Sequence, residues 1–276
     1  MDSLLEPALL VAIAAALVLG LARRTRSPRL RLDPGEFPAR WRAACGVTLL
    51  VGVIAAIVVQ PLVGLAGPGA TVDLEGASYA RLFAAHAVLG AFLLAWWVLA
   101  GFPSPATFLA LPHRDLAQRL ALGLGAGLGA WVLTIGSMSV VGGGLLWLSG
   151  ALAPGPDGAA AIAPDAAGVV PEAVDYLVGL SLPRRLLLVA SAGVFEEAFF
   201  RSFLQPRAGL LLSSLLFTAS HAGYGSPMLM IGVFLLSIVL GRLFREKQDV
   251  LPCMVAHSVF DAVQLLLVLP LVAAAE

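Results

Sequence analysis

Charged residues are the scarcest class in this 276-residue chain, where Asp, Glu, Lys and Arg together make up 12%. A soluble domain carries about a quarter of charged residues. Hydrophobic residues make up 59%, so an ordinary soluble domain is excluded and a protein that crosses a membrane several times is favoured. Formal net charge is also absent, at zero, which argues against nucleic acid as a partner.

Cysteine is also scarce, and the first residues do not have the pattern of a secretory signal. Cys45 and Cys253 are the only two cysteines, and both fall near predicted cytoplasmic helix ends, so we expect reduced apolar thiols. The first six residues include two acidic residues, Asp2 and Glu6, and no basic one. A secretory signal begins with a basic region and ends at a small-residue cleavage site. We therefore expect the first apolar run to stay in the protein as a helix.

Long apolar runs are what the chain has in abundance. A helix needs about 20 mostly apolar residues to span a membrane, and the sixth run is shorter than that. The pattern predicts an all-α fold, a polytopic membrane helical bundle of about eight transmembrane helices. The apolar runs cover about residues 4–22, 43–65, 82–101, 120–148, 186–204, 209–221, 228–244 and 250–271.

The few charges are sorted along the chain in a way that orients the bundle. Loops rich in Arg and Lys stay in the cytoplasm, so we place the Arg-rich stretch 23–42 inside and alternate from there. Arg184 and Arg185 are exceptions, on the outer side before the fifth span. The remaining basic residues fall inside and the acidic loop residues outside: Arg114, Arg119, Arg207, Arg242, Arg245 and Lys247 against Asp73, Glu75, Asp157, Asp165, Glu172 and Asp175.

Ionisable residues interrupt the apolar runs at three places in the second half of the chain. Such groups are costly inside a membrane and usually functional. With a helix rise of about 1.5 Å per residue, Glu196, His221 and His257 lie roughly 16, 21 and 12 Å from the cytoplasmic side. These depths are compatible with one cavity in the middle to inner half of the membrane.

Helical spacing assigns partners within each run. Glu197 and Arg201 are four residues apart, where opposite charges pair and neutralise each other. Glu196 points about 100° away from Glu197 and is left to face the cavity as a general base. By the same spacing, His257 shares a helix face with Asp261.

His221 and His86 also lie within apolar runs, and their roles are predicted from the residues around them. His221 shares a helix face with Phe217, and together with His257 it could hold a water, a metal ion or a developing oxyanion. His86, in the third span, has no motif partner, so we predict that it is a packing histidine.

The ordered motifs Glu196-Glu197-x-x-x-Arg201, Phe217-x-x-x-His221 and His257-x-x-x-Asp261 resemble those of the CPBP intramembrane proteases. That family includes the CAAX prenyl endopeptidases and bacteriocin-processing proteins. The resemblance covers roughly residues 186–266. It divides the chain into an N-terminal region, 1–183, with four helices and a long extracytoplasmic loop, and a catalytic core, 184–276. Two departures are Ser202, where the family often has Gly, and Asp261, where Asn is commoner.

The resemblance implies an endopeptidase in the lipid bilayer of the inner (plasma) membrane, with its site facing the cytoplasm and membrane-associated proteins or peptides as substrates. By carry-over, Glu196 and His221 activate a water, while His257 and Asp261 stabilise the oxyanion. Glu197 and Arg201 would support this shell. A divalent zinc ion on Glu196, His221 and His257 is the alternative, but no H-E-x-x-H motif is present. A glutamate mechanism without a cofactor is therefore preferred.

Other interpretations stay open. The acidic pair and Arg201 could form only an ion network that pins helices, and Asp261 could serve only to fix the tautomer of His257. The whole protein could be an inactive membrane scaffold or immunity-type protein, although an inactive relative would be free to lose the motifs. It could instead carry protons or ions, although no inverted repeat is evident. Neither the substrate nor the oligomeric state follows from the motifs.

Overall fold

The computed structural model describes residues 36–59, 79–148, 152–154, 160–162, 176–177, 179–224 and 227–273. These residues are almost entirely helical, which confirms the predicted helical membrane bundle. The predicted first span, 4–22, lies outside the described residues, so the number of eight spans stays a prediction.

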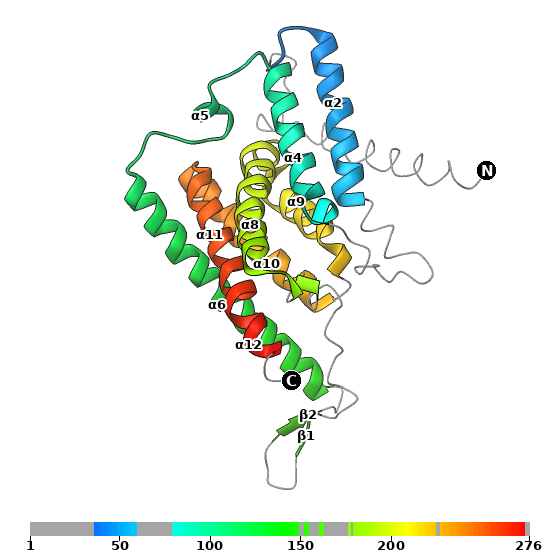
Figure 1. The fold of residues 1–276 in the computed structure, drawn as a ribbon, viewed down its shortest axis with the longest axis vertical. Coiled ribbons are helices and arrows are strands. Elements are labelled where there is room, and N and C mark those ends of the chain that lie inside the picture. The colour runs from blue at the N-terminus through cyan, green and yellow to red at the C-terminus, as the bar shows by residue number, and fades with distance from the viewer. Residues whose placement is uncertain are drawn as a thin grey trace, which may run out of the picture.

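The described part of the N-terminal region is built mainly from the long helices α2, α4 and α6 (Figure 1). α2 (Arg40–Ile54) continues into the π-helical segment η2 (Ala55–Val59), and α4 (Tyr79–Leu99) runs beside α2. The long helix α6 (Leu116–Leu148) follows a short turn of helix, α5 (Pro105–Phe108).

The C-terminal half begins with one long helical run that changes its winding. The run comprises α8 (Leu182–Ser191), the π-helical segments η3 (Ala192–Glu196) and η4 (Ala198–Leu204), and α9 (Gln205–Ser220). A short 3₁₀ turn, η5 (Ala222–Tyr224), follows it. The remaining helices are α10 (Pro227–Lys247), α11 (Val250–Ala262), π-helical η6 (Val263–Val268) and α12 (Leu269–Ala273).

Two three-residue strands, β1 (Leu152–Pro154) and β2 (Ala160–Ile162), pair antiparallel with Leu152 opposite Ile162. They lie beyond the end of the bundle that is opposite α5 (Figure 1). The predicted orientation assigns these two ends to opposite sides of the membrane.

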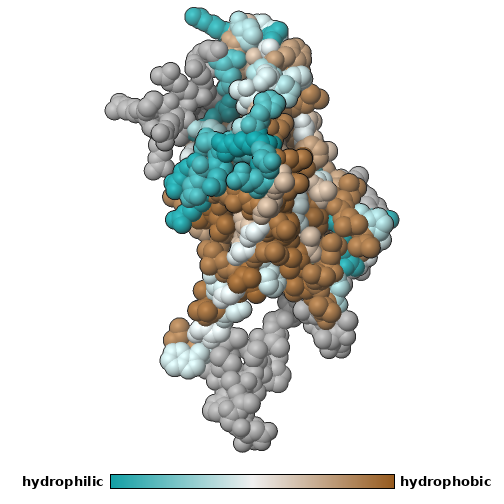
Figure 2. All heavy atoms as spheres, turned by 90° about the vertical axis from the view of Figure 1, so that its left-hand side faces the viewer, coloured by the Kyte–Doolittle hydropathy of each residue, from teal (hydrophilic) through white to brown (hydrophobic). Residues whose placement is uncertain are grey.

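Four of the described helices are long and apolar enough to cross a membrane, and α4 adds a shorter apolar helix, Phe83–Leu99. Large apolar side chains such as Val132 and Val140 are exposed on α6. Figure 2 shows hydrophilic residues gathered toward one end of the molecule above a largely apolar surface. The protein is therefore a membrane protein. The four helices cover Arg40–Val59, Leu116–Gly144, Met228–Lys247 and Val250–Leu271.

The break between the fifth and sixth predicted spans lies at Gly209. Pro206 occupies the first turn of α9, where a missing N–H costs little. Gly209 has φ 78° and ψ 166°, a region of backbone conformation that is essentially restricted to glycine. The chain therefore turns at Gly209 before it continues toward His221.

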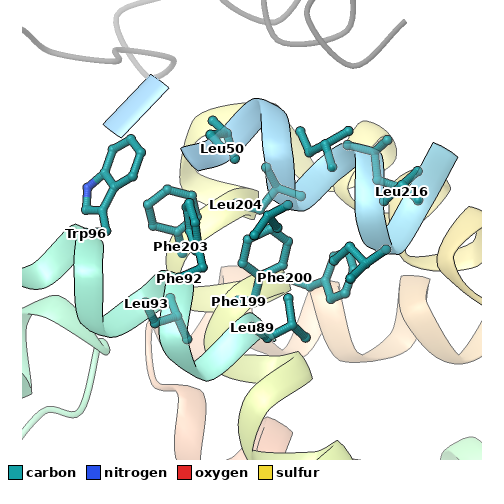
Figure 3. Close-up of a cluster of buried hydrophobic side chains, with 14 of the residues drawn as sticks. Leu50, Leu89, Phe92, Leu93, Trp96, Phe199, Phe200, Phe203, Leu204 and Leu216 are labelled. Atoms are coloured by element: carbon teal, nitrogen blue, oxygen red, sulfur yellow. The ribbon is translucent and has the colours of Figure 1, made fainter. Parts of the chain in front are cut away.

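An aromatic core joins α4 to the π-helical segment η4 (Figure 3). The ring of Phe203 lies 4.6 Å from Trp96 and 5.0 Å from Phe92, both edge-on. Trp96 is fully buried, and its indole N–H donates to Glu36 Oε1 at 2.9 Å. The ring of Trp96 therefore faces the bundle and not the membrane interface.

Close helix contacts hold α11 in place from two sides. A Cβ added at Gly127 on α6 would lie 2.5 Å from the Ala256 carbonyl oxygen, and one added at Gly193 would lie 2.8 Å from the Met254 carbonyl oxygen. Such small residues allow helix backbones to approach each other in a membrane. Gly127 therefore allows α6 and α11 to approach closely.

Candidate active site

The acidic pair lies where the fifth span is wound as a π-helix. η3 ends at Glu196 and η4 begins at Ala198, so Glu197 sits between two π-helical segments. Such π-bulges are rare and frequently occur at functional sites, because they shift side chains from their α-helical directions. Both carboxylates are buried, Glu196 at 9% exposure and Glu197 at 0%.

Glu197 and Arg201 form the ion pair that their spacing predicted. Arg201 Nε donates to Glu197 Oε2 at 3.0 Å, and neither side chain is exposed. Arg201 Nη2 also donates to Ser237 Oγ of α10 at 2.9 Å. The pair therefore neutralises two charges inside the bundle and ties the fifth span to α10.

Glu197 also holds the histidine of the eighth span. His257 Nδ1 lies 2.9 Å from Glu197 Oε1, and because the carboxylate accepts, the ring N–H donates. On the other side of the ring, His257 Nε2 lies 3.5 Å from Asp261 Oδ2. Two carboxylates thus flank one buried imidazole.

His221 stands at the end of α9 with one ring nitrogen fixed by its own helix. His221 Nδ1 donates to the Phe217 carbonyl oxygen at 2.8 Å. Its Nε2 faces Glu196 Oε2 at 3.6 Å, and Glu196 Oε2 has no hydrogen-bond partner within the described part of the chain. Glu196 and His221, from different helices, therefore direct polar atoms at each other across a short gap.

Phe217 brings the separate parts of this cluster together. Its ring centroid lies 4.7 Å from that of His221 and 5.8 Å from that of His257. The guanidinium carbon of Arg201 lies 5.2 Å from the same ring centroid. The Phe-x-x-x-His motif thus supplies both the histidine and the apolar surface on which it rests.

The predicted site residues therefore meet in one buried cluster built from η3, η4, α9 and α11. Glu196 lies against His221, whereas Glu197 joins Arg201 to His257. Asp261 pairs with His257. Ser202, one of the two departures from the family pattern, donates to the Leu109 carbonyl oxygen at 2.8 Å and does not enter the cluster.

His86 is a further member of this cluster that the sequence interpretation missed. His86 Nε2 lies 3.1 Å from Glu196 Oε1, although α4 is far from the motifs in the chain. The prediction of a packing or interface histidine without a motif partner therefore missed this contact with Glu196. A lone imidazole in an otherwise apolar span was the available signal.

The alternative zinc ligands do not fit a metal ion in this arrangement. In the described ranges, no group of three or more His, Cys, Asp or Glu side chains is placed to hold a metal. Glu196 and His221 face each other, but both ring nitrogens of His257 are directed at carboxylates, Glu197 and Asp261.

Comparison with known proteins finds a relative that matches part of the chain. An uncharacterized Bacillus subtilis (strain 168) protein, YpbD, is 36% identical over 84 residues, which are 30% of this chain and 44% of YpbD. The match thus spans less than half the length of that relative. No solved structure matches the chain.

The second comparison agrees with the motifs. Residues 179–263 match the family described as type II CAAX prenyl endopeptidase Rce1-like. This segment contains all three sequence motifs and every side chain of the cluster except His86. This segment of the chain is therefore similar to the Rce1-like family of CAAX prenyl endopeptidases, in agreement with the motifs.

Proposed function

We propose that this protein is an intramembrane endopeptidase that hydrolyses peptide bonds of membrane-associated proteins. The observation that carries the proposal is the meeting of Glu196 with His221, beside the Glu197–His257 pair, inside an apolar bundle. The match of residues 179–263 to the Rce1-like family supports the assignment of a protease in general. Isolated ion networks would need only opposite charges, whereas the described cluster holds three histidines against three carboxylates.

In the proposed reaction, Glu196 and His221 hold a water beside the scissile carbonyl carbon. Glu196 takes one proton from the water as the oxygen bonds to the carbonyl carbon, which produces a tetrahedral oxyanion. When the C–N bond breaks, the same proton passes from Glu196 to the leaving amine. Glu196 is thereby returned to its starting state, and a carboxylic acid and an amine are released.

His257 stabilises the oxyanion in this scheme. Its Nδ1–H is committed to Glu197, so Nε2 is the ring atom that remains to donate to the developing charge. Asp261, at 3.5 Å from Nε2, favours the doubly protonated ring that such donation requires. Arg201 in turn keeps Glu197 charged and in place.

The deciding experiment is a comparison of the wild-type protein with Glu196→Gln. Membrane proteomics of cells that carry either protein identifies fragments made only by the wild type, and purified protein in liposomes is then tested on the identified substrate. We expect Glu196→Gln to lower kcat by about 100-fold or more, because the general base is lost. Glu246→Gln is the matched control, since Glu246 is exposed at the end of α10.

Equal cleavage by the wild type and Glu196→Gln would overturn the proposal. An inactive scaffold would yield no cleavage by either protein and an unchanged membrane phenotype. A carrier would show ion flux into liposomes that Glu196→Gln blocks, without any peptide being cut. Metal analysis of active protein tests the metal-free mechanism, which uses no cofactor.

The proposal extends to location and partners. The basic residues near α5 and at the end of α10 are consistent with a site in the inner membrane that opens toward the cytoplasm. The substrate is a membrane-associated protein or peptide, and the lipid bilayer is the surrounding medium.

A further inference from the structure

The geometry points to His86 as a positioning residue that holds Glu196 from the N-terminal region, outside the family segment. This inference rests on the proposed function, since it assigns His86 to the general base of that reaction. Its basis is a continuous chain of hydrogen bonds from the α8 backbone through Ser191 and His86 to Glu196.

Ser191 joins His86 to the helix that leads into the site. Ser191 Oγ lies 3.1 Å from the Leu188 carbonyl oxygen, to which it can donate, and 3.0 Å from His86 Nδ1. A hydroxyl group can donate to or accept from a ring nitrogen, so this contact can form while His86 Nε2 carries a proton. The ring orientation of His86 is thus set by the helix that leads into the site.

The other ring nitrogen of His86 acts on the general base. The 3.1 Å contact between His86 Nε2 and Glu196 Oε1 needs a proton, because two lone pairs would repel each other. When Glu196 is the charged base of the proposed reaction, that proton is on His86 and is donated to Oε1. Glu196 Oε1 is then occupied, and Oε2 is the oxygen directed at His221.

Packing keeps His86 in this place. One helical turn further along α4, a Cβ added at Gly90 would lie 2.9 Å from the Phe195 ring, so α4 is pressed against η3. Leu89, three residues after His86, is 2% exposed. His86 itself is 6% exposed. A buried imidazole fixed by both packing and hydrogen bonds can hold a carboxylate in one rotamer.

The arrangement gives each carboxylate of the acidic pair its own partner. Arg201, from the same helical run, contacts Glu197, whereas His86, from α4, contacts Glu196. Glu196 and Glu197 therefore have different partners, which lie on different helices of the bundle. The N-terminal region thereby contributes a side chain on which the catalytic geometry depends.

The kinetic test uses variants of His86 and Ser191 on the substrate found for the wild type. His86→Leu removes the donor to Glu196, and we expect kcat to fall by about 100-fold with KM unchanged, since a small misplacement of a reacting group costs that much. His86→Gln, whose amide N–H can reach Oε1, should recover most of the loss. Ser191→Ala should show a smaller loss of kcat.

Two matched controls separate this effect from general damage. Ser139→Ala removes a hydroxyl that bonds only to its own helix backbone, at Ile135, on the exposed face of α6. His113→Gln alters an exposed loop histidine. Both variants should keep the kcat of the wild type.

A second measurement needs no substrate and tests the contact itself. The unfolding temperatures of His86→Leu, Glu196→Gln and the double variant form a double-mutant cycle, and we expect the two single shifts not to add. Additive shifts, or a His86→Leu protein with the kcat of the wild type, would overturn the inference. Absence of cleavage by the wild type would refute the proposed function, while the cycle would still decide whether His86 holds Glu196.

Discussion

Both oxygens of the Glu197 carboxylate have hydrogen-bond donors in the cluster. One carboxylate oxygen accepts from Arg201 and the other from His257, and the side chain has no exposed surface. Both oxygens of a fully buried carboxylate are therefore satisfied by donors that can carry positive charge. Removal of either donor would leave charge unbalanced where water cannot reach it.

Arg201→Leu tests this balance. We expect the substitution to destabilise the protein by about 3–5 kcal/mol, because the Glu197 carboxylate loses its cation in a buried place. Thermal unfolding in detergent measures the loss. Arg245→Leu, on the exposed end of α10, is the control and should leave the unfolding temperature almost unchanged. Similar unfolding of both variants would show that the ion pair does not stabilise the bundle.

Asp261 allows a second residue-level prediction, one of activity. Asp261→Asn keeps the size of the side chain and supplies an N–H that can donate to an oxyanion, so we expect it to retain cleavage. Asp261→Leu removes both the charge facing His257 Nε2 and any donor. We expect it to lower kcat by about 100-fold. Steady-state kinetics on one substrate distinguish the two, and a Leu variant as active as Asn would contradict this role.

At the level of elements, helix contacts decide where the site residues meet. α11 carries His257 and Asp261, and it is packed between α6 on one side and η3 on the other. Gly127 and Gly193 permit these contacts, since a Cβ at either position would meet backbone oxygen of α11. Gly193 therefore allows the fifth span to approach the eighth, and Gly127 does the same for the fourth.

Gly127→Ala and Gly129→Ala form a matched pair on one helix. The added methyl group would meet the Ala256 carbonyl oxygen at 2.5 Å in the first variant and nothing within 4 Å in the second. We expect Gly127→Ala to lower stability by about 1–3 kcal/mol through overpacking. Gly129→Ala should be neutral or slightly stabilising, since alanine favours helix more than glycine does. Thermal unfolding of the two variants side by side measures the difference, and equal stability would show that α6 yields at no cost.

At the level of the whole molecule, polarity runs along the long axis of the bundle. The loop with His113 and Arg114 lies at one end, and the hairpin of β1 and β2 lies at the other (Figure 1). The predicted orientation places the first end in the cytoplasm and the second outside. The access route of a substrate depends on this orientation.

Single cysteines test the orientation in cells. In a Cys45→Ser background, where the remaining Cys253 is buried, His113→Cys and Ala161→Cys place one thiol at each end. A membrane-impermeant maleimide should label Ala161→Cys in intact cells and His113→Cys only after the membrane is opened. The Cys45→Ser parent should stay unlabelled. The reverse pattern would invert the topology and move the proposed site toward the outer face.

Composition and helical periodicity by themselves determined the membrane class, most helix positions and the Glu197–Arg201 pair. These features depend on residues close in the chain, whose spacing along a helix is known in advance. The three motifs likewise indicated which spans carry the site.

Only the tertiary structure decided which faces of distant helices meet. It buried Trp96 against Phe203, joined Glu197 to His257 and brought His86 of α4 to Glu196. Such contacts depend on how helices rotate and approach one another, and helical periodicity carries no information about that. For the same reason, one of the closest partners of Glu196 lay outside every motif.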